Sequence, residues 1–249
     1  MNPLTTVSIC GYLSSKSVHK SSSKNVGETL DLFYLAKNNR PRSYPANVAH
    51  PHHPSGQRLR LNTPAEAYAY VAEVARSLRL ELKGSLGFGV RQTFLLVPVP
   101  SSDVTENSVD TARWPARELA KALAVQGFGR VWKPVVNREA TEPTHAKKDA
   151  APAAPVPTLS KAEIIAHNYV RRRSPPPTAD PILYVDDLLT WGDHLVALDH
   201  VLAPRIRRGA FAIAITCGQT IDCYEPRAKV ITCDTSSSPW GRPVVADPT

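Results

Sequence analysis

Two adjacent carboxylates, Asp186 and Asp187, directly follow a short apolar run from Ile182 to Val185. Such a run is typical of a buried strand in a parallel sheet, and the residues after Gly192 repeat apolar positions at helical spacing. The acidic pair is therefore predicted at the carboxyl end of a strand. Open α/β sheets bind ligands in that crevice, where amides of the next helix can hold a phosphate. The chemistry expected there is the binding of a phosphorylated sugar.

The segment from Asp186 to Gly192 resembles the phosphoribosyl-pyrophosphate (PRPP) binding motif of type I phosphoribosyltransferases, apolar-apolar-Asp-Asp-x-x-Thr-Thr-Gly-x-Thr. Asp186, Asp187, Thr190 and Gly192 match its characteristic positions. The resemblance implies that the two carboxylates are the catalytic pair and hold the ribose hydroxyls. It also implies a loop around the 5′-phosphate, formed by Thr190, Trp191, Gly192, Asp193 and His194.

Acidic pairs also follow strands in Walker B motifs and in the receiver domains of response regulators. This sequence has no Gly-x-x-x-x-Gly-Lys-Ser/Thr loop to hold the phosphates of an NTPase. A receiver would place its acidic pair near the start of the domain, whereas only a short stretch follows Asp187. Both alternatives are therefore less well supported than the phosphoribosyltransferase resemblance.

Two upstream segments resemble the ComF-like branch of the same family and occur in the family's order. Val97-Pro98-Val99-Pro100 ends an apolar run. Leu159 to Asn168 is similar to a Leu-Ser-x-x-Glu-Arg-x-x-Asn element, without the arginine and with the asparagine one position later. The resemblance covers roughly Leu30 to Thr216 and implies an α/β fold, a Rossmann-like parallel sheet flanked by helices with an irregular N-terminal hood. It places the following residues on the pyrophosphate side: Ser101, Ser102, Asp103 and Val104.

Three departures from the family pattern leave two functions open. Thr111 to Arg117 replaces an Arg-Gly-Phe-Asn-Gln segment, and Trp191 replaces a threonine, where it could fill the phosphate site, stack on a base or anchor a partner. Asp193 either repels the phosphate, at roughly 4 kcal/mol for like charges ~4 Å apart, or caps the next helix. One candidate is a glycosyltransferase that transfers phosphoribosyl from PRPP to an acceptor, with Mg²⁺ bound through PRPP and by Asp186 and Asp187. The other is a catalytically degenerate regulatory, effector or nucleic-acid-binding subunit of a larger assembly.

Composition agrees with one globular domain that acts on an anionic partner. The chain has 249 residues, of which 42% are hydrophobic, and no apolar run approaches the ~20 residues of a membrane span. No secretory signal is recognisable. The four cysteines lack Cys-x-x-Cys spacing, which argues against a zinc ribbon and favours free thiols in a protein of the reducing cytoplasm. The net charge of +8 suits PRPP, a nucleotide or nucleic acid, without choosing between them.

The expected organisation is a flexible segment over residues 1–28, a phosphoribosyltransferase-like domain over 29–233 and a tail over 234–249. A strand at Val7 to Cys10 could still dock on the sheet. Residues 138–158 form an insertion too long for an ordinary connection, with Lys147 and Lys148 as candidate flap residues. The His50 to His53 cluster is interpreted as an incidental surface loop, and Arg171 to Arg173 as the end of a helix.

Local signals predict most of the elements. Thr63-Pro64-Ala65-Glu66 is a capping box with a helix to about Leu82, and Ser160-x-x-Glu163 is a second one. Further elements are expected as follows: helices over 30–37, 115–126 and after Gly192, core strands at 93–97, 131–136 and 210–216, and a possible edge strand at 229–233.

Overall fold

The structure is a computed structural model that describes residues 4–13, 31–32, 34–36, 45–49, 58–81, 92–140, 161–176, 180–189, 193–202, 213–221, 229–233 and 243–245. Its named helices are α3 (Pro64–Glu81), α4 (Pro115–Val125), α5 (Lys161–Asn168) and α6 (Asp193–Leu202). Its strands are β1 (Leu4–Leu13), β2 (Ala46–Ala49), β3 (Arg58–Leu61), β4 (Phe94–Pro98), β5 (Gly129–Val131), β6 (Val135–Asn137), β7 (Tyr169–Arg171), β8 (Ile182–Leu189), β9 (Ile213–Ile221), β10 (Lys229–Cys233) and β11 (Pro243–Val245).

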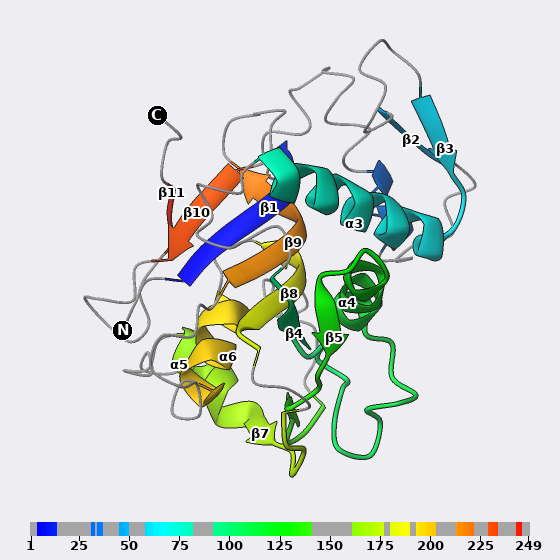
Figure 1. Cartoon of the computed structure of the whole chain (residues 1–249). Helices are drawn as coiled ribbons and strands as arrows, with labels where there is room; N and C mark the ends of the chain where they lie inside the picture. The colour runs from blue at the N-terminus through cyan, green and yellow to red at the C-terminus, as the bar shows by residue number, and fades with distance from the viewer. Residues whose placement is uncertain are drawn as a thin grey trace, which may run out of the picture.

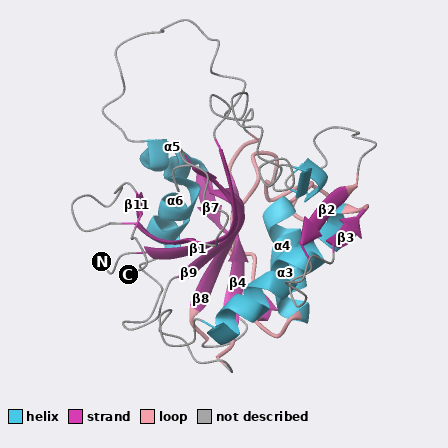
Figure 2. Ribbon diagram, turned by 90° about the horizontal axis from the view of Figure 1, so that it is seen from above, coloured by secondary structure: helices cyan, strands magenta, loops and turns pink. Residues whose placement is uncertain are grey.

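A seven-stranded sheet in the order β11-β10-β1-β9-β8-β4-β5 forms the centre of the molecule (Figure 1). The pairs β1–β9, β9–β8, β8–β4 and β4–β5 are parallel, whereas β10 and β11 add antiparallel strands at one end. The predicted α/β class with a parallel sheet flanked by helices is therefore confirmed. Figure 2 shows α5 and α6 on one face of the sheet and α3 and α4 on the other.

The alternation of side chains along β4 and β8 explains both helical layers. Successive residues of a strand point to opposite faces, so a strand covered on both sides is apolar throughout. Leu96 and Leu183 belong to the core under α3 and α4, whereas Leu95 and Tyr184 belong to the core with α6. The central strands thus contribute to both layers at once.

The strand order reverses between β4 and β8. From β4 the chain passes through α4 to β5 at the sheet edge, and from β8 it passes through α6 to β9 in the opposite direction. The last backbone contact between these strands is Val99 N–H donating to the Val185 carbonyl at 2.8 Å. Beyond this point β8 continues beside β9 to Leu189, whereas the chain after β4 leaves the sheet; open α/β sheets bind ligands at such a reversal of strand order.

The capping box that predicts α3 is present. Thr63 Oγ1 accepts from the Glu66 backbone N–H at 3.2 Å, and the Glu66 carboxylate accepts from the N–H groups of Asn62 and Thr63 at 2.5 and 3.0 Å. These backbone hydrogen bonds lower the pKa of Glu66. The reciprocal pair satisfies amides that a helix start leaves without partners, which fixes the beginning of α3. The starts of α4, α5 and α6 and helical residues 31–32 and 34–36 also agree with the predictions.

Three predicted elements need correction. The strand expected over 131–136 is two strands, because Pro134 lacks an N–H between β5 in the main sheet and β6, which pairs with β7 instead. Arg171 to Arg173 do not end a helix: α5 stops at Asn168 and Arg171 ends β7. The strand expected at the edge, β10, has the predicted bounds but lies between β1 and β11.

The two ends of the chain contribute strands to the sheet. The N-terminal strand allowed at Val7 to Cys10 extends over Leu4–Leu13, and β11 lies within the stretch expected to be a tail. The hairpin β2–β3 forms a separate antiparallel ribbon beside α3 and α4 (Figure 2). Among the helices within the described ranges, none has the length and apolar character needed to cross a membrane.

Candidate functional site

The acidic pair lies in β8 directly after its last backbone contact with β4 at Val185, but not at the end of the strand as predicted, because β8 continues beside β9 to Leu189. Asp186 is 8% exposed, and its Oδ1 accepts from the Asp187 backbone N–H at 2.8 Å. By the strand alternation, Asp186 lies on the face covered by α5 and α6 and Asp187 on the face covered by α4. The fold therefore brings both carboxylates to one edge of the sheet but gives them different surroundings.

A buried tyrosine and a histidine accompany Asp186. The Tyr169 hydroxyl, at the start of β7, shares a hydrogen bond of 3.0 Å with Nδ1 of His194 in the first turn of α6. Burial raises the pKa of Tyr169 well above its usual value, and the negative charge of Asp186 raises it further. The hydroxyl therefore stays protonated and joins β7 and α6 beside the end of β8.

The loop after β4 is held by Asn137, which ends β6. Its Nδ2 donates to the carbonyls of Ser101 and Val104 at 2.6 and 3.0 Å, and its backbone N–H donates to the Val104 carbonyl at 2.8 Å. Asn168 Nδ2 donates to Asn137 Oδ1 at 3.4 Å and to the Glu139 carbonyl at 3.1 Å. The carboxyl edge of β4 is thereby tied to the end of α5.

Trp114 holds the same loop from the other side. Its ring is 1% exposed, its Nε1 donates to the Val99 carbonyl at 2.6 Å, and the Arg117 guanidinium lies 5.8 Å from the ring centroid. Val104 and Val109 pack in the same cluster. Trp114 lies in the segment that departs from the ComF-like pattern, so this chain fills that position with a packed aromatic ring.

The structure brings only some of the predicted site residues together. Asp186, Asp187, Asp193 and His194 lie at the carboxyl edge with the Ser101 to Val104 loop; Asp193 lies in the first turn of α6, where a carboxylate suits the helix dipole. Val104 is fully buried in the apolar cluster, so its side chain packs in the core and cannot face a ligand. Other predicted residues lie outside the described ranges: His50 to His53, Lys147, Lys148, Thr190, Trp191 and Gly192.

Tyr169, Asn137 and Trp114 carry no sequence signal that assigns them to this edge. Asn168 is recognisable from the sequence only as the last residue of the stretch that resembles the ComF-like element. A polar residue that directly follows the apolar pair Val135-Val136 was the available signal for Asn137. The contact between Tyr169 and His194 joins residues 25 positions apart, and no local pattern encodes it.

The carboxylates of Asp186 and Asp187 are the candidate metal-ligating groups at this edge. Among the residues described, no group of three or more His, Cys, Asp or Glu side chains could hold a metal ion. Mg²⁺ is commonly bound by one or two carboxylates together with substrate phosphates, and Asp186 and Asp187 could supply the carboxylates.

A scan against protein-family models and a search of curated proteins found no match for this chain.

Proposed function

We propose that the carboxyl edge of β4 and β8 binds a phosphorylated ribose, with Mg²⁺-PRPP as the expected ligand, in a fold of the type I phosphoribosyltransferase kind. One observation carries the proposal: Asp186 and Asp187 lie in β8 just past its last contact with β4, where the strand order reverses, and α6 is the next helix along the chain. Carboxylates can accept from ribose hydroxyls, and the amides at a helix start can hold a phosphate. Both groups of a sugar phosphate would thus meet complementary partners.

Different residues would contact different parts of the ligand. Asp187 is the less buried of the two residues, although its Oδ2 is buried, and would accept from the ribose hydroxyls. Thr190, Gly192 and the first amides of α6 would hold the 5′-phosphate. The loop from Ser101 to Asp103 would face the pyrophosphate. Transfer would break the bond between the anomeric carbon and pyrophosphate while an acceptor atom bonds to that carbon. Catalysis would come from positioning and electrostatic stabilisation of an oxocarbenium-like centre.

A non-catalytic descendant of this fold is the second candidate, and the burial of Asp186 favours it. Only 8% of this residue is exposed, and one of its oxygens already accepts the Asp187 amide. Trp114 occupies the loop in which the family carries Arg-Gly-Phe-Asn-Gln. A protein of this kind would keep the nucleotide or sugar-phosphate site as a sensor or act as a subunit of an assembly. Its basic surface would then serve nucleic acid, with binding that weakens steeply as salt rises.

Calorimetric titration of Mg²⁺-PRPP into wild type, Asp187→Asn and Asp180→Asn tests the site. Asp180 precedes the amino end of β8 and accepts from Thr93 Oγ1 at 3.1 Å, so it is a matched carboxylate at the opposite edge. We expect micromolar binding by wild type and Asp180→Asn, and a loss of at least about tenfold in Asp187→Asn. Equal affinities for all three proteins, or no binding at all, would refute the proposal.

Release of pyrophosphate distinguishes the two candidates once binding is established. Incubation with PRPP and candidate bases or nucleic acid should release pyrophosphate from an active transferase, and Asp187→Asn should abolish the release. PRPP binding without any release supports the non-catalytic candidate. Filter binding of nucleic acid across a salt series then tests its basic surface, because phosphate contacts must weaken as salt increases.

A further inference from the structure

A hollow lies between α5, β7 and α6, and neither Asp186 nor Asp187 is among its lining residues. It has a volume of 360 Å³, at the small end of the range for small-molecule sites. We name it the α5/α6 cavity, and its lining residues are Glu163, Ala166, His167, Tyr169, Arg171, His200 and Val201. None of the interactions proposed for PRPP uses the α5 or α6 side chains that line it.

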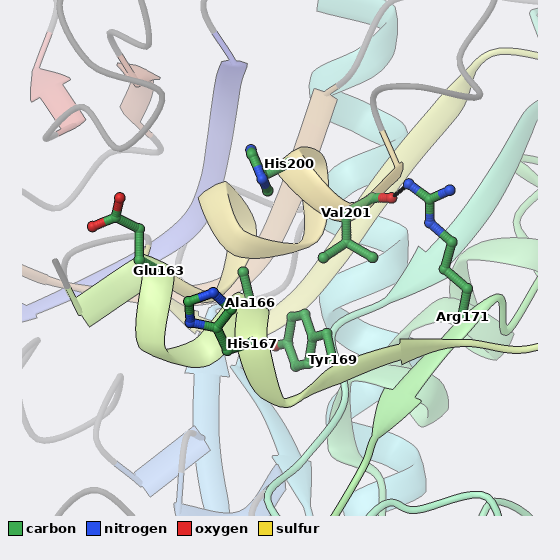
Figure 3. A pocket seen from close by; sticks show the side chains of 7 residues that line it. All are labelled: Glu163, Ala166, His167, Tyr169, Arg171, His200 and Val201. Atoms are coloured by element: carbon green, nitrogen blue, oxygen red, sulfur yellow. Dashed lines mark hydrogen bonds between the residues drawn. The ribbon is translucent and has the colours of Figure 1, made fainter. Parts of the chain in front are cut away.

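The lining combines an apolar wall with charges at separate ends. Figure 3 shows the Tyr169 ring, Ala166 and Val201 along the middle, with Glu163 at one end of the row and Arg171 at the other. Arg171 Nη2 donates to the Val201 carbonyl, which orients the guanidinium at the end of α6. A guanidinium has five N–H donors, so a single bond to a carbonyl does not exhaust it.

These features select the charge of a ligand. A guanidinium pairs well with a carboxylate, and the imidazoles of His167 and His200 add further polar contacts. Glu163 would repel a second negative charge in the same small space, which disfavours a phosphate dianion. The ring of Tyr169 and the two aliphatic side chains favour a ligand with an apolar body. A small organic monocarboxylate meets all three requirements.

We propose that the α5/α6 cavity binds a small organic carboxylate that regulates the sugar-phosphate site through Tyr169. The regulatory half rests on the proposed function. One residue belongs to both places: its ring lines the cavity, and its hydroxyl is bonded to His194 in the first turn of α6 at 3.0 Å. A ligand packed on the ring fixes this side chain and keeps its bond to His194. Part of the phosphate site is then already ordered, so a sugar phosphate loses less conformational entropy when it binds. This gives positive coupling between the two sites.

Binding is tested with benzoate as the probe and benzyl alcohol as its uncharged counterpart, both titrated into the full chain without PRPP. We expect benzoate to bind and benzyl alcohol to bind at least about tenfold more weakly, because the guanidinium pair is lost. His167→Ala and Arg171→Gln should weaken benzoate. Arg130→Gln removes an exposed arginine of β5, at the far edge of the sheet, and should not. No benzoate binding, or binding that neither cavity variant weakens, overturns the site.

Coupling is tested with Tyr169→Phe, which keeps the aromatic wall but removes the hydroxyl. Benzoate should shift the ¹⁵N resonances of the His194 ring in wild type and leave them unchanged in Tyr169→Phe, with similar benzoate affinity. It should also raise the affinity for Mg²⁺-PRPP by about fivefold in wild type alone. Equal responses in the two proteins overturn the coupling. If PRPP does not bind, the proposed function fails while the benzoate titration and the His194 resonances still decide this inference.

Discussion

Asn137 makes a sharp test of how the loop after β4 is held, because its amide acts as a donor to two carbonyls at once. Asn137→Ala removes both bonds, and Asn137→Asp keeps the shape but replaces the donor with a group that, when ionised, only accepts. If the amide N–H groups position the loop, the isosteric Asn137→Asp must destabilise the protein more than Asn137→Ala. If Asn137 only fills space, Asn137→Ala must be the more destabilising substitution.

The contacts give the expected magnitudes. The Val104 carbonyl still accepts the Asn137 backbone N–H at 2.8 Å in either variant, so only part of its bonding is lost. The Ser101 carbonyl loses its bond of 2.6 Å in a half-buried position. Asn137→Ala leaves one acceptor without its donor and opens a small cavity, so the free energy of unfolding should fall by about 2–3 kcal/mol. Asn137→Asp buries a carboxylate at 5% exposure beside two carbonyls, which should cost about 3–5 kcal/mol.

Urea unfolding at pH 7 measures both variants against wild type, with the affinity for Mg²⁺-PRPP measured on the folded fraction. The free energies of unfolding should fall in the order wild type, Asn137→Ala, Asn137→Asp. Both variants should also bind Mg²⁺-PRPP more weakly, because the loop on the pyrophosphate side is no longer fixed. If Asn137→Asp and Asn137→Ala have the same free energy of unfolding, the claim that the amide donors hold this loop is refuted.

Two further predictions test the packing of the fold. Asp199 accepts a hydrogen bond from the Tyr184 hydroxyl at 2.9 Å, and burial raises its pKa. The stabilisation from this carboxyl group is therefore complete below its unfolded-state pKa of about 3.9 and is lost as the pH rises through its higher folded-state pKa. Asp199→Asn keeps an acceptor without this loss, so urea unfolding across pH 4 to 8 should show a gain over wild type that grows with pH; a constant difference would contradict it. Gly129→Ala should cost about 3 kcal/mol or more in the same assay, because the backbone has φ +144° and an added Cβ would lie 1.9 Å from the Phe94 carbonyl oxygen. Gly127→Ala, at φ +79° in open space, is its control and should cost about 1–2 kcal/mol.

The parts of the fold that sequence could predict are those encoded by neighbouring residues. The Thr63–Glu66 capping box and Pro115 mark helix starts through bonds or backbone angles within one turn. The apolar runs before Pro98 and Asp186 mark strands because a strand covered on both faces has no polar position. The same signals place the acidic pair after the apolar run of β8 but miss that the strand continues beside β9 to Leu189.

The parts that sequence could not predict depend on partners distant in the chain. The strand β7 follows α5 without a break, and the three arginines after Tyr169 look like a helix end until β6 is available to pair with them. Asn137 and Ser101 are 36 residues apart, so the bond that holds the loop has no local signature. Trp114 could be read only as a departure from a family pattern, whereas its buried N–H bond reveals a structural role.

A reversal of strand order like that between β4 and β8 is common to open α/β sheets, so it does not by itself identify a ligand. The more informative feature is the unequal placement of the two carboxylates. Asp186 is buried near Tyr169, and its negative charge raises the pKa of that tyrosine, so its first role is internal. Asp187 lies on the other face and is less buried. A site in which both acids touch the sugar requires Asp186 to become more accessible when the ligand arrives. A site in which Asp187 alone touches the sugar leaves Asp186 in place, although one Asp187 oxygen, Oδ2, is itself buried. Such a site would bind a sugar phosphate without the second acid that the proposed transferase reaction uses.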